Sequence, residues 1–391
     1  MTARIPWPGR LVYVLPYLGI GGTEYHVLHL VRAIAWREPP RVVAPDGPLR
    51  PEFVAAGARM HLFDDLTGNW WVGMRTFRRA LGEALAEGSG SAAPVAGTRA
   101  SSIVHVHGAA ELLWLAYRQA RRQKAPARFL FTSHGYFGPG ARTSYRLAAW
   151  ILRRLRVPVI AVSQEEARRL QKAGLPPGQL RVVHNGVPDP LQQPAPAWPF
   201  GDGRPRVLFV GRLAEQKGVR QLLEAFEQVS PAAPGARLVI VGAGPLEAEL
   251  RERIRRSESL RTRVELAGPV PGAARLMAHA DVVCMPSLDE ALSLVGIEAL
   301  ACGRALVASR AGGTGELIED GTSGVLVPPG DVTALARALE RVLADPGLRE
   351  RLGEGARRRY ETAFTVEAMA AKTAAIYAGS ESRPGDGRAW R

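Results

Sequence analysis

Two glutamates stand eight residues apart in a segment that could bind a polyhydroxylated ligand. Glu290 lies in the loop after the apolar run DVVCMPS, and Glu298 lies little more than one turn into an amphipathic helix expected to start near Leu294. Each carboxylate can accept two hydrogen bonds from hydroxyl groups, as recognition of a sugar or a ribose requires. The helix dipole favours negative charge at this helix start, and the free amides of Leu294 and Val295 suit a phosphate. An unpaired carboxylate within VGIEALA would be costly, which argues against Glu298 as a plain surface residue.

Two basic side chains occupy a second loop. The segment RVLFVGRLAEQKG predicts a strand that ends at Gly211, followed by a loop that carries Arg212 and Lys217 and ends at Gly218. A bidentate guanidinium and an ammonium at a helix start form a clamp for a diphosphate. Together with the two glutamates on a neighbouring loop of the same domain, these residues predict a site for a nucleotide-diphosphate sugar.

The first half of the chain offers a glycine loop and three histidines at strand ends. In LGIGGTEY, Gly21 and Gly22 precede Thr23, the expected helix cap, an arrangement suited to phosphate. The histidines that follow predicted strands are His107, His134 and His184. A single histidine is usually structural, and His134, which precedes a glycine, is the one we expect to face a ligand.

Several chemistries are excluded by missing motifs. Neither glycine stretch has the dinucleotide spacing, and VGAGPLEAEL has Glu247 where the third glycine would stand, so a dinucleotide oxidoreductase is not expected. The sequence contains no HExxH, no metal-spaced cysteine and histidine cluster, no G-x-S-x-G elbow and no Walker A motif. Asp64 and Asp65 lack the DxD spacing of metal-dependent sugar transferases. We therefore expect no metal ion and no cofactor.

Short β-branched runs alternate with helical segments along the whole chain. This pattern predicts an α/β fold of two doubly wound domains with parallel sheets, facing across a cleft. The predicted parts are an N-terminal domain at 1–190, a proline- and glycine-rich linker at 191–204, a C-terminal domain at 205–365, and a C-terminal helix with a frayed tail at 366–391 that returns toward the first domain. A low-complexity stretch at 86–102 is expected to be a surface loop.

The composition is that of a globular protein of a reducing compartment. The 391 residues are 46% hydrophobic and 23% charged, which excludes disorder and collagen-like repetition. Cys284 and Cys302 lie in apolar runs and cannot build a disulfide framework or a four-thiolate metal site. The longest apolar run, LVYVLPYLGI, is too short to span a bilayer and leads into the glycine loop, which favours a buried strand over a signal peptide. We expect a cytoplasmic protein.

Nearly all of the excess positive charge lies in the first half of the chain. The net charge is +14; residues 1–200 hold 25 basic and 12 acidic residues, or +13, and the remainder holds 26 and 25, or +1. Such asymmetry attracts an anionic partner, which could be a nucleic acid, an acidic lipid or a phosphorylated substrate. The alternative is that these arginines are simply solvent-exposed residues on helix surfaces, with no anionic partner.

In order and spacing, these motifs resemble the retaining glycosyltransferases of family 4. The similarity runs from GIGG through VSQEEARRL, VHNGV, GRLAEQKG and VGAGP to the two glutamates and GTGELIEDGTSGVLVPPGD. The resemblance implies the GT-B fold, in which two Rossmann-like domains face each other. It also implies transfer of a hexose with retention of its anomeric configuration, with a diphosphate oxygen accepting the acceptor's proton and without a metal.

The resemblance also implies roles for individual residues. Glu298 would hold the nucleotide ribose, Glu290 the donor hexose, and Arg212 with Lys217 the diphosphate, while His134 would face the donor sugar. The glycine loop would close on donor phosphate or on the acceptor. The predicted catalytic set is His134, Arg212, Lys217 and Glu290; the donor-binding set is Gly21, Gly22, Arg212, Lys217, Val270, Glu290, Ser293, Leu294, Val295 and Glu298; the acceptor-side set is Gly22, His107 and Asn185.

The expected partners are a nucleotide-sugar donor and a glycan, lipid-linked or small-molecule acceptor. The basic first half further predicts a peripheral contact with an anionic membrane at its inner face; no nucleic acid is expected. The alternative is a basic nucleic-acid-binding or adaptor protein on an α/β scaffold, which would give Glu290 and Glu298 no role. The base, the sugar and the acceptor stay open.

Overall fold

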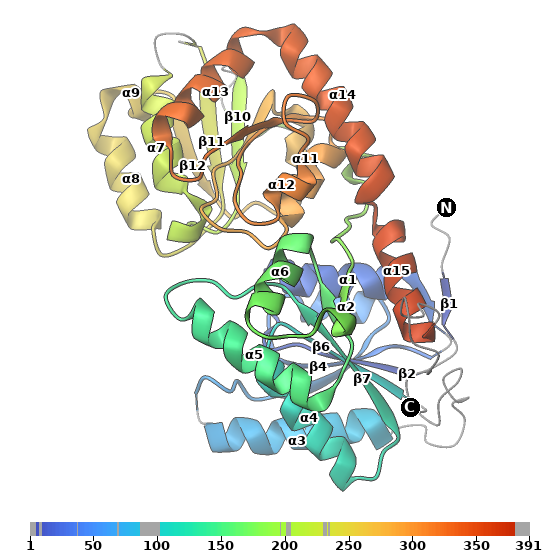
Figure 1. The fold of residues 1–391 in the computed structure, drawn as a ribbon. Coiled ribbons are helices and arrows are strands. Elements are labelled where there is room, and N and C mark those ends of the chain that lie inside the picture. The colour runs from blue at the N-terminus through green and yellow to red at the C-terminus, as the bar shows by residue number, and fades with distance from the viewer. Residues whose placement is uncertain are drawn as a thin grey trace. The chain divides into compact units, whose positions relative to one another are not determined.

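The computed structural model describes residues 5–7, 10–36, 38–68, 70–86, 102–195, 197–200, 205–229, 233 and 235–379. The chain divides into two units, one formed by Met1–Gly186 with Val366–Arg391 and one formed by Val187–Thr365 (Figure 1). The boundary between the two units at Gly186 and Val187 thus falls a few residues before the predicted linker at 191–204. Most of the predicted loop at 86–102, residues 201–204 of the linker and the tail from residue 380 lie outside the described residues.

The first unit is built on a parallel sheet of seven strands in the order β5-β4-β2-β6-β7-β8-β9. These strands are β2 (Arg10–Val14), β4 (Arg41–Pro45), β5 (Arg59–Phe63), β6 (Ser102–His107), β7 (Ala127–Ser133), β8 (Val159–Ala161) and β9 (Leu180–Val182). A separate pair of short parallel strands is formed by β1 (Ile5–Trp7) and β3 (Ile34–Trp36). Successive strands run outward in opposite directions from β2 and β6, and a doubly wound sheet binds ligands at the carboxyl ends of such a central pair.

Helices cover both faces of this sheet. They are α1 (Gly22–Ala33), α2 (Arg50–Ala55), α3 (Trp70–Ala86), α4 (Ala110–Arg122), α5 (Ala141–Leu155), α6 (Gln164–Lys172) and α15 (Val366–Ala378). Alternate strand residues point to opposite faces, so Val12 and Val14 join the apolar cluster under α3 to α6, while Leu11 and Tyr13 join the cluster under α1, α2 and α15. The C-terminal helix α15 therefore completes the core of the first unit.

The second unit repeats this plan with six parallel strands in the order β12-β11-β10-β13-β14-β15. The strands are β10 (Arg206–Val210), β11 (Arg237–Val241), β12 (Val264–Gly268), β13 (Val282–Met285), β14 (Ala305–Ser309) and β15 (Val325–Val327). The helices are α7 (Val219–Gln228), α8 (Glu247–Arg256), α9 (Glu258–Arg261), α10 (Ala273–Leu276), α11 (Leu294–Ala301), α12 (Thr314–Leu317), α13 (Val332–Ala344) and α14 (Pro346–Ala363). Here the strand order reverses between β10 and β13.

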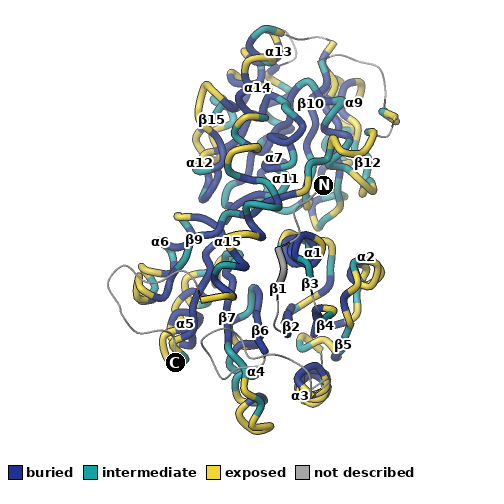
Figure 2. Tube along the Cα trace, turned by 90° about the vertical axis from the view of Figure 1, so that its right-hand side faces the viewer, coloured by how far each residue is buried: buried dark blue, intermediate teal, exposed yellow. Residues whose placement is uncertain are grey.

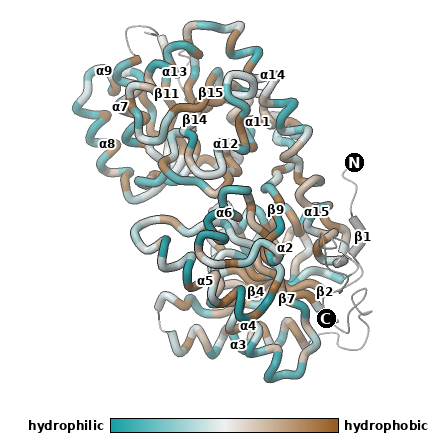
Figure 3. The backbone as a smooth tube through the Cα atoms, viewed as in Figure 1, coloured by the Kyte–Doolittle hydropathy of each residue, from teal (hydrophilic) through white to brown (hydrophobic). Residues whose placement is uncertain are grey.

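Burial follows the apolar strands in both units. Figure 2 shows the strands largely buried and the outward faces of the helices exposed, and Figure 3 shows hydrophobic residues concentrated along the strands. The predicted α/β fold with two parallel doubly wound sheets is confirmed. Among the described residues, no helix combines the length and the apolar character that crossing a bilayer would need.

Candidate functional site

Two loops of the second unit emerge side by side where its strand order reverses. β10 and β13 are parallel neighbours, and their carboxyl ends lead into the loops 211–218 and 286–293. The backbone amide of Leu288 donates to the carbonyl of Gln216 at 2.8 Å, and the Gln216 side-chain amide donates to the carbonyl of Asp289 at 2.9 Å. The two predicted loops are therefore bonded together at the position where doubly wound sheets bind ligands.

Two glycines let the backbones approach. Gly218 has φ +64°, and a Cβ there would lie 1.9 Å from the carbonyl oxygen of Pro286. Gly312, after β14, has φ +50°, and its Cβ would lie 1.7 Å from the carbonyl oxygen of Glu290. The amide of Gly313 donates to that same oxygen at 3.0 Å. Positive φ and the absence of a side chain make glycine the residue that fits both positions, and the loops after three neighbouring strands meet at Glu290.

Glu290 and Lys217 form an ion pair in this loop cluster. The Lys217 ammonium donates to Oε1 of Glu290, and the Ser287 hydroxyl donates to the same oxygen at 2.8 Å. Glu290 is buried, and the Lys217 side chain is about one quarter exposed, at 23%. A buried carboxylate needs such compensation. Lys217, predicted to be available for a diphosphate, thus also neutralises Glu290, and its three ammonium hydrogens allow both contacts.

Helix α11 begins immediately after this loop. Ser293 is its N-cap, and its hydroxyl accepts a hydrogen bond from the amide of Gly296 at 3.3 Å. No partner within the described part of the chain is recorded for the amides of Leu294 and Val295. The helix start predicted from sequence is confirmed, and it presents two free N–H groups at the positive end of the helix dipole.

Glu298, in the second turn of α11, is a half-buried carboxyl group with no side-chain hydrogen bond among the described residues. Burial raises the pKa of Glu298 to about 7 from its ordinary value of 4.5. A carboxylate that is withdrawn from water without a partner is destabilising in its charged form. Two hydroxyl donors from a ligand would remove that cost, so Glu298 is suited to bind vicinal hydroxyls.

The remaining predicted residues of this unit lie at its surface. Arg212 is exposed, and its guanidinium makes a long hydrogen bond of 3.4 Å to Oε1 of Gln216. This weak contact leaves the cation available for an anion. Val270 follows β12, the edge strand two places from β10, and is partly exposed.

In the first unit, the glycine loop holds a carboxylate. Gly21, not Thr23, is the N-cap of α1, so the predicted cap was wrong. The buried Glu24 accepts a hydrogen bond from the amide of Gly19 at 3.1 Å, and a Cβ on Gly21 would lie 2.7 Å from its Oε2. Burial raises the pKa of Glu24. A side-chain carboxyl therefore lies at the helix start where the sequence suggested phosphate.

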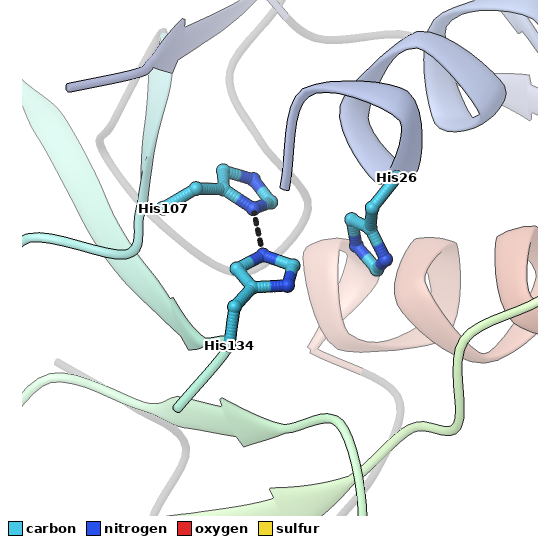
Figure 4. Close-up of side chains that lie close together, drawn as sticks. All are labelled: His26, His107 and His134. Atoms are coloured by element: carbon cyan, nitrogen blue, oxygen red, sulfur yellow. Dashed lines mark hydrogen bonds between the residues drawn. The ribbon is translucent and has the colours of Figure 1, made fainter. Parts of the chain in front are cut away.

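Three histidines from separate elements gather at the carboxyl ends of β6 and β7 (Figure 4). His107 ends β6, His134 follows β7, and His26 comes from α1. Nδ1 of His107 and Nε2 of His134 are hydrogen-bonded at 3.1 Å, and Nδ1 of His26 is hydrogen-bonded to Oδ1 of Asn185 at 2.9 Å. Burial, followed by the effect of neighbouring histidines, lowers the pKa of His107 and of His134 well below its ordinary range. These two imidazoles are therefore neutral near pH 7.

The placement of these side chains differs from what the sequence suggested. The side chains of His107 and Asn185 are buried and bond to His134 and His26, respectively; their predicted place on the acceptor side stays a prediction. Ligand nitrogens of the three histidines lie within 4.8 Å of one another, a separation at which imidazoles could hold a metal ion. Two of the ring nitrogens already bond to each other, and the expectation of no metal stays a prediction.

Sequence profiles of known families match both units. The profile described as "Glycosyltransferase Family 4" matches residues 20–189, and "Glycosyl transferases group 1" matches residues 204–345. The chain belongs to the group 1, family 4 glycosyltransferases. The recognition made from the motifs is thereby confirmed, and the adaptor alternative is not favoured.

The curated relatives that this chain resembles carry the names of different enzymes. A glycogen synthase of Mycobacterium tuberculosis is 32% identical over 249 residues, 61% of this chain and 58% of the relative. An alpha-D-kanosaminyltransferase of Streptomyces kanamyceticus is 36% identical over 178 residues, 45% of this chain and 46% of the relative. The chain spans about half the length of these curated relatives.

A solved structure shares the fold over nearly the whole chain. HepE of Anabaena in complex with UDP-glucose has a TM-score of 0.77 at 21% identity, covering 94% of this chain and 98% of that chain. The fold of this glycosyltransferase family member is therefore GT-B.

The sequence predicted the two loops and α11 but not the parts played by His26, Glu24 and Gly312. The available signals were a helix face for His26 and Glu24 and a glycine pair after a strand for Gly312.

Proposed function

We propose that the chain transfers a hexose from a nucleotide-diphosphate sugar to an acceptor hydroxyl, with retention of the anomeric configuration and without a metal ion. The observation that carries this proposal is that three features lie together where the strand order of the second unit reverses. They are the ion pair of Lys217 and Glu290, the free amides at the start of α11, and Glu298, which has no side-chain hydrogen bond among the described residues. Each group matches a different part of such a donor.

The diphosphate has three sources of positive potential. The amides of Leu294 and Val295 and the dipole of α11 favour an anion at this helix start. The exposed guanidinium of Arg212 can bind two phosphate oxygens at once, and the Lys217 ammonium can hold Glu290 and a phosphate together. The ribose would then lie along α11, where Glu298 accepts its two hydroxyls.

In the proposed reaction, the bond from the anomeric carbon to the diphosphate oxygen breaks, and the electron pair goes to that oxygen. The acceptor hydroxyl oxygen bonds to the same face of the sugar, and its proton passes to the departing diphosphate oxygen. Lys217 and Ser287 both bond to Oε1 of Glu290, which withdraws electron density from this carboxylate, and the proposed reaction uses no protein nucleophile. The protein's main contribution is electrostatic stabilisation of the departing diphosphate, which typically accounts for about 10²- to 10³-fold in turnover per donor group.

The acceptor is proposed to bind mainly to the first unit and to be a glycan, a lipid-linked sugar or a small molecule. An anionic membrane surface is a proposed partner of α5, whose exposed residues include Leu147 at 43%, Trp150 at 51%, and Arg153 and Arg154. Basic and aromatic side chains on one amphipathic helix suit such a surface. Flotation with acidic vesicles at low salt tests this contact, with neutral vesicles as the control; equal recovery from both would contradict it.

The transferase proposal is tested by incubating the full chain with UDP-, GDP- and ADP-hexoses and a mixture of sugar acceptors. We expect release of one nucleotide that depends on the donor and is unchanged by EDTA. Lys217→Met serves as the matched inactive variant. Absence of nucleotide release from every donor, or equal release by the variant, would contradict the proposal, and loss of activity in EDTA would contradict its metal-free part.

A further inference from the structure

The hydrogen bond between His107 and His134 can run in either direction. Both rings are neutral near pH 7, so each carries one N–H and one lone pair. If His107 donates from Nδ1, His134 must carry its proton on Nδ1. If His134 donates from Nε2, His107 must carry its proton on Nε2. The direction therefore decides whether the free nitrogen of His134 is a hydrogen-bond donor or an acceptor.

The surroundings of His107 favour donation from its Nδ1. Nε2 of His107 is buried and has no hydrogen-bond partner among the described residues. Were His134 the donor, this position would hold a buried N–H without an acceptor, and orphaned N–H groups are rare in protein interiors. With His107 as the donor, the position holds only a lone pair.

His26 favours the same direction. Its Nδ1 lies 2.9 Å from Oδ1 of Asn185, and because an amide oxygen only accepts, His26 carries its proton on Nδ1 and a lone pair on Nε2. The His26 and His134 rings are 4.8 Å apart, edge to face, and Figure 4 shows the free nitrogen of His134 on the side turned toward His26. An N–H at that nitrogen is electrostatically preferred beside a neutral ring whose Nε2 carries a lone pair rather than a second N–H.

The orientation of the His107 ring is also fixed by a neighbouring ring. It packs against the ring of His105, with ring centres 4.0 Å apart and the ring planes tilted by 39°. His105 is itself anchored, because its two nitrogens bond to Tyr377 of α15 at 2.8 Å and to Thr132 at 2.7 Å. These contacts oppose a ring flip that would exchange the two nitrogens of His107.

We propose that His107 is a positioning residue that fixes His134 as the Nδ1–H tautomer, so that His134 offers a permanent hydrogen-bond donor rather than a base. The inference rests on the proposed function in one respect, that the oxygen receiving this N–H belongs to the transferred sugar. His134 then orients the sugar and does not remove a proton from it.

The tautomers are read directly by long-range ¹H–¹⁵N NMR of the full chain labelled in its eight histidines, with His134→Asn and His107→Asn used for assignment. We expect proton-bearing Nδ1 and lone-pair Nε2 for both His107 and His134. A proton on Nε2 of His134 in the unaltered protein would overturn the inference.

Two substitutions separate positioning from a merely structural role. His107→Asn places an amide donor near the former Nδ1 and should keep His134 in its tautomer, whereas His107→Leu removes the donor and should give a mixture. With a nucleotide sugar that the unaltered protein turns over, we expect kcat to fall about tenfold in His107→Leu, because one oriented hydrogen bond is lost. In His107→Asn we expect kcat to be largely restored. An unchanged His134 spectrum in His107→Leu would contradict the inference. If no donor is turned over, the proposed function fails while the spectra still decide the tautomer.

Discussion

Replacement of Glu298 by glutamine should change how nucleotide binding depends on pH. The pKa of this carboxyl is raised to about 7, and only the ionised form accepts hydrogen bonds from both ribose hydroxyls. One pH unit below the pKa, about a tenth of the carboxyl groups are ionised, so affinity at pH 6 should be roughly tenfold weaker than at pH 8, or about 1.4 kcal/mol. Glutamine keeps one acceptor oxygen and does not titrate, which removes this dependence and weakens binding at pH 8.

Isothermal titration calorimetry of the preferred nucleotide at pH 6, 7 and 8 measures the effect. Ionisation of the nucleotide itself contributes equally to both proteins, so the ratio of their dissociation constants isolates Glu298. We expect this ratio to change about tenfold across the range. The same pH dependence in both proteins would refute the assignment of the ribose to Glu298.

The same pKa shift predicts a pH-dependent stability. Between pH 4.5 and about 7 the folded chain retains a proton on Glu298 that the unfolded chain releases, so the free energy of unfolding falls as pH rises through this window. The full shift corresponds to an upper limit of about 3 kcal/mol, reduced because the residue is partly exposed to water. Urea unfolding of Glu298→Gln should lack this component.

Two further substitutions test the loop cluster. Lys217→Met should lower turnover by about two orders of magnitude and also lower the melting temperature, because Glu290 is left buried without its cation; adding Glu290→Gln should restore the melting temperature but not turnover. Recovery of turnover in the double variant would show that Lys217 acts only on Glu290. Gly312→Ala should cost about 2 to 4 kcal/mol in the free energy of unfolding, because its Cβ would overlap the Glu290 carbonyl, whereas Gly315→Ala, whose nearest contact would be 3.9 Å away, should be near neutral. Equal melting temperatures for the two alanine variants would contradict this packing.

Much of the second unit could be predicted because its signals are local. A β-branched strand followed by a basic loop predicted β10 and the loop after it. A second strand, followed by a loop and an apolar helix, predicted β13, its loop and the start of α11 near Leu294. Once both strands belong to one parallel sheet, their loops must share an edge. The placement of Arg212 and Glu298 follows from that rule.

What could not be predicted are side-chain partnerships between distant segments. Lys217 and Glu290 are separated by 73 positions, and nothing near either residue indicates that they pair. The cap of α1 was misassigned because the helix begins at Gly22, with Gly21 as an N-cap that makes no side-chain hydrogen bond. Glu24 instead bonds to the amide of Gly19 in the preceding loop, a contact that no local capping pattern indicates. His26 was missed because, on a helix, it follows the ordinary period of a buried face.

A crystal structure of the full chain with the nucleotide selected by the donor screen tests the central claim most directly. The account predicts the ribose hydroxyls within hydrogen-bond distance of Glu298 and the diphosphate against the amides of Leu294 and Val295, with Lys217 and Arg212 beside it. A nucleotide bound elsewhere, or bound here with Glu298 and the α11 amides untouched, would contradict the account.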